Sequence, residues 1–398
     1  MSDRKATLRR LGPVLLAVLL DLLGFGIVIP LLPYYAESYG ATEQQAMALM
    51  GIYSVAQLVF APVWGALSDR IGRRPVMLVS IAATATFLTA FAAAPSLLWL
   101  FVFRALHGAA AANISTAQAY VADVTTPEDR AMGMGLIGAS FGVGFTLGPL
   151  VGGLLAQYGL AVPFFLAAGL SAANFLWAVF GLPESRPVGE AGSARREIDP
   201  RRVLSALTHP VVGAALLLTF AATFAFSMME VAFGLVAEHI WFPDLTREDV
   251  AMEVGKMFGL IGVLGIVIQG GLMRRLSKRF GEPPLVVAGY AFQVLGLLGL
   301  AFAQGGWETW VVCALLAIGS SLANPALQAL ISKGVDADSQ GSVLGVNQSL
   351  SALARATAPW VALFAYGVLR SAPFLAAAGV MFLALLLALP ATRRAAAR

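Results

Sequence analysis

Twelve stretches of this chain are apolar and long enough to cross a lipid bilayer, and this pattern restricts the chain to a membrane fold. About 20 apolar residues form a helix that spans ~30 Å of hydrocarbon. The composition agrees, because 59% of the 398 residues are hydrophobic, only 12% are charged, and the mean hydropathy is +0.80. We predict spans at residues 11–33, 46–68, 76–94, 97–121, 131–156, 162–181, 211–237, 254–273, 284–303, 307–331, 341–366 and 371–391.

The positive residues are distributed unevenly over the gaps between these spans. Twenty-one of the 26 Lys and Arg residues lie before the first span, after the last, or in every second gap between them. Lys and Arg are retained on the cytoplasmic side during insertion, so we predict that both termini are cytoplasmic. Short loops and alanine-rich spans indicate a bacterial inner membrane. The same asymmetry accounts for the net charge of +4 without a nucleic-acid partner.

Polar residues at loop ends predict where two of the spans begin. Thr42 with Gln45, and Thr246 with Asp249, fit capping boxes that open the second and eighth spans. The single cysteine, Cys313, lies inside a predicted span, which excludes a disulfide framework and a thiolate metal site. We expect no metal and no cofactor.

An internal repeat divides the chain. A shift of 209 residues superposes Gly72 on Gly281, and other landmarks repeat at nearly the same offset. Two halves in one orientation are a known plan of transporters. We predict an N-terminal six-helix half at 1–181, a cytoplasmic linker at 182–210 that is rich in Pro, Gly and charge, and a C-terminal half at 211–398.

The loop after the second span carries a motif that goes beyond the arginines needed to keep this loop on the cytoplasmic side. Residues 65–76 read Gly-Ala-Leu-Ser-Asp-Arg-Ile-Gly-Arg-Arg-Pro-Val, which resembles the loop signature of the major facilitator superfamily. The resemblance implies the major facilitator fold, with Asp69 facing the start of span eleven near Gly341 and Arg70 paired with Asp123. It implies a cytoplasmic latch made of Gly65, Asp69, Arg70, Gly72, Arg73, Arg74 and Asp123.

The fifth span is rich in glycine in a pattern that matches the antiporter motif of the same family, which points to export. Small residues at i and i+4 let helices approach closely in lipid. Generic close packing is the alternative reading, and a similar series in the eighth span suggests that the halves meet along a glycine-lined seam. The motif consists of Gly138, Gly142, Gly144, Gly148, Pro149, Gly152 and Gly153.

Two ionisable residues fall inside the predicted spans of the first half. Residues 21–33 are similar to the corresponding segment of tetracycline/proton antiporters and their twelve-span drug-exporter relatives. Asp21 lies about ten residues into its span, or ~15 Å from the cytoplasmic start, and Arg104 matches the intramembrane arginine motif of the family. A buried ionisable group normally faces a partner or a water-filled cavity. We therefore predict a proton-coupling role for Asp21 and Arg104, against the alternative of a purely structural ion pair.

Other polar and aromatic residues in the spans are candidates for a substrate cavity. Glu230 is a candidate contact for organic cations, and the alternative is an ion pair with Arg355. His107, one turn from Arg104, fits a hydrogen-bonding role better than proton relay. The full set is Phe25, Asn113, Gln118, Phe226, Glu230, Asn324, Gln328, Asn347 and Arg355. Tetracycline antiporters carry further acidic residues in spans three and nine, and this chain has none there, so the resemblance is weakest for tetracycline itself.

These observations predict a proton-coupled antiporter that exports drug-like or other small amphipathic molecules by alternating access. Such a protein contributes to multidrug efflux and antibiotic resistance. We expect a monomer whose partners are the small-molecule substrate, protons and the lipid bilayer. A metabolite facilitator or symporter of the same fold is the alternative, followed by a transport-dead membrane receptor. An enzyme is not expected, because the three histidines are scattered and no nucleophile-base set is present.

Overall fold

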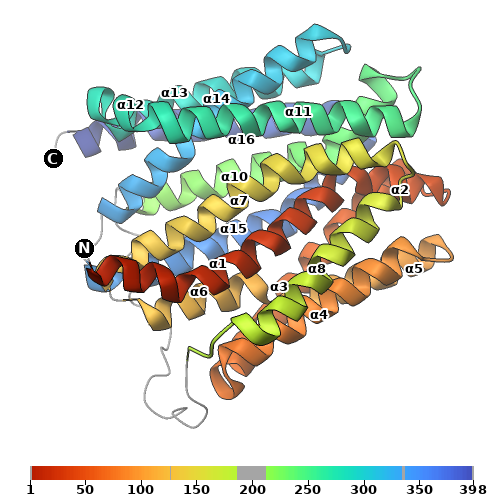
Figure 1. The fold of residues 1–398 in the computed structure, drawn as a ribbon. Coiled ribbons are helices and arrows are strands. Elements are labelled where there is room, and N and C mark those ends of the chain that lie inside the picture. Colours follow the sequence, from red (N-terminus) through yellow and green to blue (C-terminus); the bar gives the residue numbers. More distant parts are fainter. Residues whose placement is uncertain (1, 126, 186–211, 334–336, 397–398) are drawn as a thin grey trace. The chain divides into compact units, whose positions relative to one another are not determined.

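The computed structural model describes residues 2–125, 127–185, 212–333 and 337–396, and all regular secondary structure in these residues is helical (Figure 1). The helices group into two compact units. The first unit contains α1 (Ser2–Val28), η1 (Ile29–Leu31), α2 (Leu32–Ser38), α3 (Glu43–Ile71), α4 (Arg73–Ala92), α5 (Leu97–Ala110), α6 (Asn113–Val124), α7 (Pro127–Ala156) and α8 (Val162–Gly181). The second contains α10 (Val212–Val236), η2 (Ala237–Trp241), α11 (Arg247–Val267), η3 (Ile268–Leu272), α12 (Met273–Phe280), α13 (Glu282–Phe302), α14 (Trp307–Lys333), α15 (Ala337–Val368) and α16 (Ala372–Ala396).

Eleven segments of the described chain are long and apolar enough to cross a membrane. They coincide with eleven of the twelve spans predicted from the sequence. The remaining prediction, residues 341–366, falls on α15, which is a helix of 32 residues. This helix carries polar residues, among them Asn347 and Arg355.

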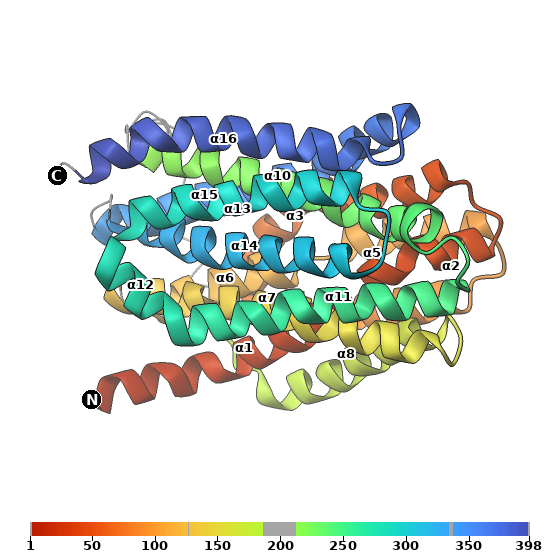
Figure 2. The same ribbon diagram turned by 90° about the horizontal axis from the view of Figure 1, so that it is seen from above.

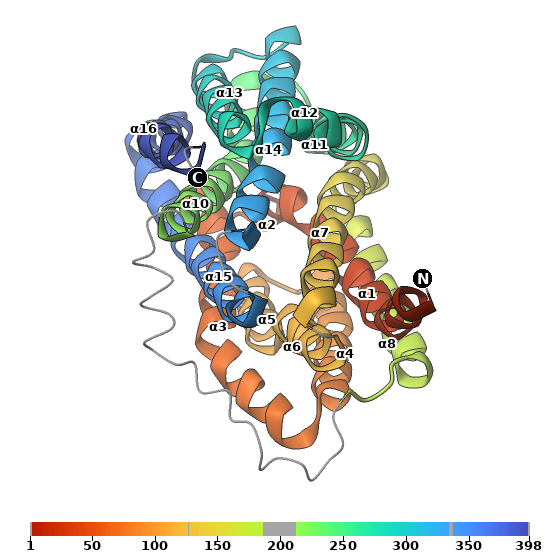
Figure 3. The same cartoon turned by 90° about the vertical axis from the view of Figure 1, so that its left-hand side faces the viewer.

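In the first unit, α1 lies against α7, α6 and α8 (Figure 3). The α1–α7 contact is made backbone to backbone. A Cβ atom at Gly148 would lie 2.6 Å from the backbone of Gly26, and one at Gly144 would lie 2.7 Å from the carbonyl oxygen of Leu22. These antiporter-motif glycines, with Gly152 against Ile27, therefore hold α7 on α1 of the same half. A Cβ atom at Gly138 or Gly142 would have no described neighbour within 4 Å.

The fourth predicted span is not continuous. The sequence predicts one helix over residues 97–121, but α5 ends at Ala110 and α6 begins at Asn113. Side chains from neighbouring helices satisfy the backbone groups that the break releases. Ser80 Oγ donates to the carbonyl oxygen of Ala110 and accepts from the amide of Ala112, and Trp64 Nε1 donates to the carbonyl oxygen of Ala109.

In the second unit, α13 lies between α14 and α16 (Figure 2). Gly289 on α13 and Gly319 on α14 allow the same close approach as on α1 and α7, since a Cβ on either would lie 2.6 Å from the carbonyl oxygen of the other. The repeat is visible at its motif glycines. Gly72 joins α3 to α4 with φ of 101°, and Gly281 joins α12 to α13 with φ of 76°. Both turns need a backbone conformation that glycine adopts without steric cost.

The predicted caps are found at both helix starts. Thr42 and Gln45 form the complete capping box at the start of α3. Thr246 caps α11 by accepting from the amide of Asp249, but the Asp249 carboxylate accepts from the hydroxyl of Thr246. The second cap is therefore confirmed, and its Asp side chain bonds the cap hydroxyl instead of the cap amide.

Candidate transport site

A cavity of about 20 Å³ lies among the helices of the first unit. A water molecule needs about 10–15 Å³ measured in this way, so the space admits a small group. Residues from α1, α3, α4, α5 and α6 and from the break between α5 and α6 line it. They are Asp21, Phe25, Val28, Tyr53, Gln57, Ser80, Thr84, Leu88, Arg104, His107, Ala111, Asn113 and Ile114.

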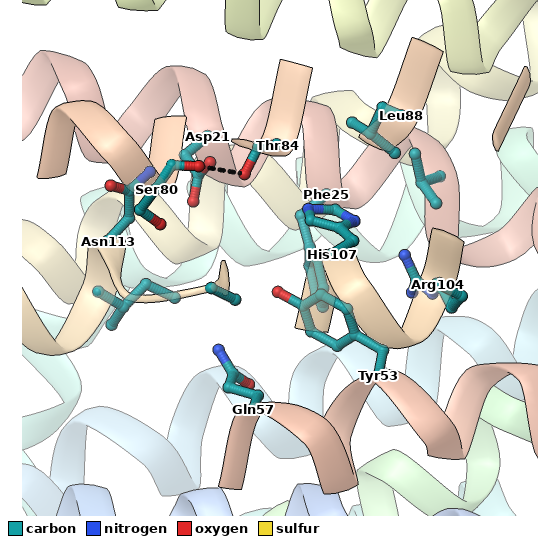
Figure 4. A pocket seen from close by; sticks show the side chains of 13 residues that line it. Asp21, Phe25, Tyr53, Gln57, Ser80, Thr84, Leu88, Arg104, His107 and Asn113 are labelled. Carbon is teal, nitrogen blue, oxygen red and sulfur yellow. Dashed lines mark hydrogen bonds between the residues drawn. The ribbon is translucent and has the colours of Figure 1, made fainter. Parts of the chain in front are cut away.

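One end of the cavity is formed by Asp21 and the polar groups at the broken span (Figure 4). Asp21 is partly buried on α1, and the side chain of Asn113 lies beside its carboxyl group. Asn113 is the first residue of α6, so the carboxyl lies at the positive end of a half-helix. Ser80 holds the break open from α4, and the hydroxyl of Thr84 donates to the carbonyl oxygen of Ser80.

The other end is formed by Arg104 and aromatic rings. The guanidinium carbon of Arg104 lies 4.5 Å from the centroid of the Tyr53 ring. The same ring meets His107 edge-on at 5.1 Å and Phe25 at 5.6 Å between centroids. No ion pair joins Asp21 to Arg104 in the described structure, so the alternative of a purely structural pair between them is not formed.

The structure thus brings together four residues selected from the sequence, namely Asp21, Phe25, Arg104 and Asn113. Gln118 lies further along α6, half-buried, and does not line the cavity. Four other polar lining residues were not predicted from the sequence, namely Tyr53, Gln57, Ser80 and Thr84. A signal for them exists, because each pair is spaced i, i+4 on a span that is otherwise mostly apolar, and such residues share one helix face.

The loop motif forms a compact charged cluster around Arg73. This side chain is 8% exposed and bonds Asp69 at 2.7 Å, Asp123 at 3.0 Å and the Ser68 hydroxyl at 2.6 Å. The predicted pairing of Arg70 with Asp123 is therefore wrong. Arg70 lies in the last turn of α3 and is exposed, whereas the turn at Gly72 directs the chain so that Arg73 returns between α3 and the end of α6.

Glu184, which belongs to the segment predicted as a linker, completes this cluster. Its carboxylate accepts from the backbone amides of Arg73 at 2.9 Å and Arg74 at 3.1 Å. A carboxylate at the first amides of a helix satisfies two unpaired donors and complements the helix dipole. Arg74 also donates from Nη2 to the carbonyl oxygen of Val179 on α8. The predicted partner of Asp69 lies near Gly341, whose surroundings are outside the described residues. The carbonyl oxygen of Gly65 accepts a hydrogen bond from the Ser68 hydroxyl.

The remaining candidates lie on helices of the second unit. Glu230 on α10 and Arg355 on α15 are close enough for the charge of the arginine to act on the carboxyl group, and these two helices are in contact. Asn347 on α15 is 2% exposed, and its side-chain oxygen has no described hydrogen-bond partner. The exposed candidates are Phe226 on α10 and Asn324 and Gln328 on α14.

Comparison with known proteins agrees with this architecture. The sequence profile of the Major Facilitator Superfamily matches residues 14–359. The chain is 35% identical over 390 residues to the class C tetracycline resistance protein of Escherichia coli, covering 96% of each chain. It is 34% identical over 351 residues to the class G tetracycline resistance protein of Vibrio anguillarum, covering 87% of each.

The fold is also that of a solved human transporter. The structure of the human organic anion transporter MFSD10 (TETRAN) superposes with a TM-score of 0.69 and 28% sequence identity, covering 96% of this chain and 99% of that one. The family match spans most of the chain and both halves. The chain therefore belongs to the major facilitator superfamily of membrane transporters.

Proposed function

We propose that this transporter is a proton-coupled secondary active exporter that exchanges inward-moving protons for small amphipathic, drug-like molecules. Its membership of the superfamily supports transport by alternating access of two halves. The identity with tetracycline resistance proteins supports export of drug-like compounds. Proton coupling and the class of substrate rest on the residues of the cavity.

Asp21 is the observation that carries the proposal. Inserting an ionisable carboxyl group into a membrane span is energetically unfavourable. Such residues therefore usually have a function, as part of an ion pathway, a proton relay or a substrate site. Asp21 lines the cavity beside Asn113 and has no described ion pair with Arg104. A carboxyl group without a fixed cation can take up and release a proton as its surroundings change. Arg104 cannot, because a guanidinium group stays protonated in proteins.

The cluster around Arg73 supports alternating access. It links the α3–α4 turn to the ends of α6 and α8 through Asp123 and Glu184, which keeps this end of the first half rigid while the halves move. We propose that it lies at the cytoplasmic surface of a bacterial inner membrane, with both termini on that side. Asp69 then stabilises the state in which the cytoplasmic ends are closed.

Transport into proteoliposomes tests the proposal. Purified protein is reconstituted, a pH gradient is imposed, and the accumulation of cationic, neutral and zwitterionic fluorescent drugs is followed. We expect the wild type to accumulate at least one class and Asp21→Asn to lose gradient-driven accumulation while remaining folded. Asp244→Asn removes the same charge from an exposed loop and serves as the matched control. Full gradient-driven transport by Asp21→Asn would show that another residue couples the proton, and Glu230 is the next candidate. Downhill transport by the wild type that does not depend on pH would favour a facilitator.

A further inference from the structure

Arg104 is a buried cation whose hydrogen-bonding capacity is largely unused. The residue is 3% exposed, and its Nε and Nη1 atoms are buried without an acceptor among the described residues. No described carboxylate forms an ion pair with it. Buried charges in proteins are normally paired and hydrogen-bonded, because removing a charge from water without compensation is very unfavourable. An arginine in this condition on a cavity wall can receive an acceptor that enters the cavity.

The ring beside Arg104 does not supply that acceptor. Tyr53 offers the face of its ring to the guanidinium group, which stabilises the charge but accepts none of the in-plane N–H bonds. Stacking of this kind fixes the plane of the guanidinium group. The donors at its edge, arranged as a planar fork, then suit a bidentate oxyanion such as a carboxylate.

The cavity keeps its two opposite charges apart. The titratable or charged groups on its wall are Asp21, Arg104 and His107, together with the phenol of Tyr53. Figure 4 shows Asp21 beside Ser80 and Asn113 at one side of the cavity and Arg104 at the other, with Phe25 and His107 between them. Because no ion pair joins Asp21 to Arg104 in the described structure, Arg104 remains available to a ligand.

We infer that Arg104 forms an anion subsite, which receives a carboxylate or a similar delocalised oxyanion of the transported molecule. The inference rests on the proposed export function and names the class of substrate as amphipathic organic anions. The cavity volume of about 20 Å³ fits one small substituent, so the subsite holds the anionic group while the rest of the molecule lies elsewhere. The rings of Phe25 and Tyr53 provide apolar surface next to that group.

A charge consequence follows for the transport cycle. If Asp21 carries one proton inward while a monoanion leaves, two charges cross the membrane in the same electrical sense. Export of a monocation against one proton moves no net charge. A membrane potential that is negative inside therefore drives the export of an anion more strongly than that of a neutral analogue.

Binding of three dansyl compounds to the purified full chain tests the subsite without a proton gradient. Dansylglycine carries a carboxylate, its methyl ester is neutral, and dansylethylenediamine is a cation with the same fluorophore. We expect the wild type to bind the acid more tightly than the ester or the amine. Arg104→Gln should weaken binding of the acid at least about tenfold, as expected for loss of a hydrogen bond between charged groups, with ester binding changed less than about twofold. Arg104→Lys should retain part of the affinity, because it keeps the charge but loses the planar fork.

The control variant is Arg275→Gln, which removes an equal charge from an exposed position on α12 and should bind all three compounds as the wild type does. The inference is overturned if the acid does not bind, if the ester or amine binds better, or if Arg104→Gln weakens all three equally. The comparison of the three compounds on the wild type needs no variant, so it tests the preference for a carboxylate even if Arg104→Gln fails to fold. Selective binding of the acid without any gradient-driven transport would refute the export function alone. Gradient-driven export of the amine with no effect of Arg104→Gln on binding would refute the subsite alone.

Discussion

The Nε atom of Arg73 lies 3.0 Å from Oδ2 of Asp123, which ties the first turn of α4 to the last turn of α6. Arg73 is nearly buried and holds two further bonds, to Asp69 and Ser68. The neighbouring Arg70 is exposed. The two arginines of one motif therefore have different structural roles, although the sequence alone does not show which of them binds Asp123.

We expect Arg73→Gln to destabilise the protein by about 1.5–3 kcal/mol, the usual effect of losing hydrogen bonds between charged groups. Arg70→Gln should change stability much less, because its side chain is in water or at the membrane surface. Thermal unfolding of the detergent-solubilised protein, followed by size-exclusion chromatography, measures both. A larger loss for Arg70→Gln than for Arg73→Gln would show that the cluster is wrongly assigned.

Glu184 should stabilise the start of α4 through its two backbone hydrogen bonds. Glu184→Ala removes both and leaves the amides of Arg73 and Arg74 without this acceptor, at a cost of about 0.5–2 kcal/mol, as for other helix caps. Glu184→Gln keeps an acceptor and loses only the charge, so its effect should be smaller. Thermal unfolding again provides the measurement, and an equal loss in both variants would indicate that the charge alone matters.

Close contact between α1 and α7 should make Gly148 intolerant of a side chain. Gly148→Val should destabilise the first half by about 1–3 kcal/mol, the usual effect of overpacking, because its Cβ would meet the backbone of Gly26 at 2.6 Å. It should also impair transport, since Asp21 is on the helix that would be displaced. The matched control is Gly142→Val, where nothing described lies within 4 Å of the new carbon. Equal tolerance at both positions would contradict the packing found here.

Ser80 should maintain the break in the fourth span. Ser80→Ala removes its bonds to Ala110 and Ala112, and two backbone groups inside the membrane then lose their partner, which costs about 1–3 kcal/mol each. We expect lower stability and reduced transport, because the break positions Asn113 against Asp21. Thr86→Ala is the control, since this hydroxyl is exposed and bonds only to its own helix. If Ser80→Ala transports and melts like Thr86→Ala, the break does not depend on this side chain.

The positions of eleven spans could be predicted from the sequence because each depends on a local property, the length of an apolar run. The break in the fourth span could not. Residues 109–112 are four alanines, which favour helix, and the interruption depends on Ser80 and Trp64 from other helices. A tertiary contact of this kind leaves no mark in the local sequence.

The candidate site was predictable to the extent that charge in an apolar span is conspicuous. Asp21 and Arg104 stand out for this reason, and the structure places both on one cavity. Their separate surroundings did not follow from their similar depth in the membrane. Depth along the helix axis says nothing about rotation around it, and here Asn113 and Tyr53 are the neighbours of the two charges. The role of Glu184 could not be predicted, because this residue follows a proline in a segment whose composition is typical of a linker.

The central claim is that Asp21 exchanges a proton for substrate, and proton release on binding tests it most directly. Purified protein in weakly buffered detergent is mixed with a compound that it transports, and a pH-sensitive dye reports the protons released. Because binding equilibria are reciprocally linked, exchange requires that substrate and proton weaken each other's binding. The account therefore predicts proton release on substrate binding in the wild type and in Asp244→Asn, and none in Asp21→Asn, even for an anionic substrate, whose charge alone would favour protonated Asp21. Equal release from Asp21→Asn, with substrate binding intact, would contradict the account.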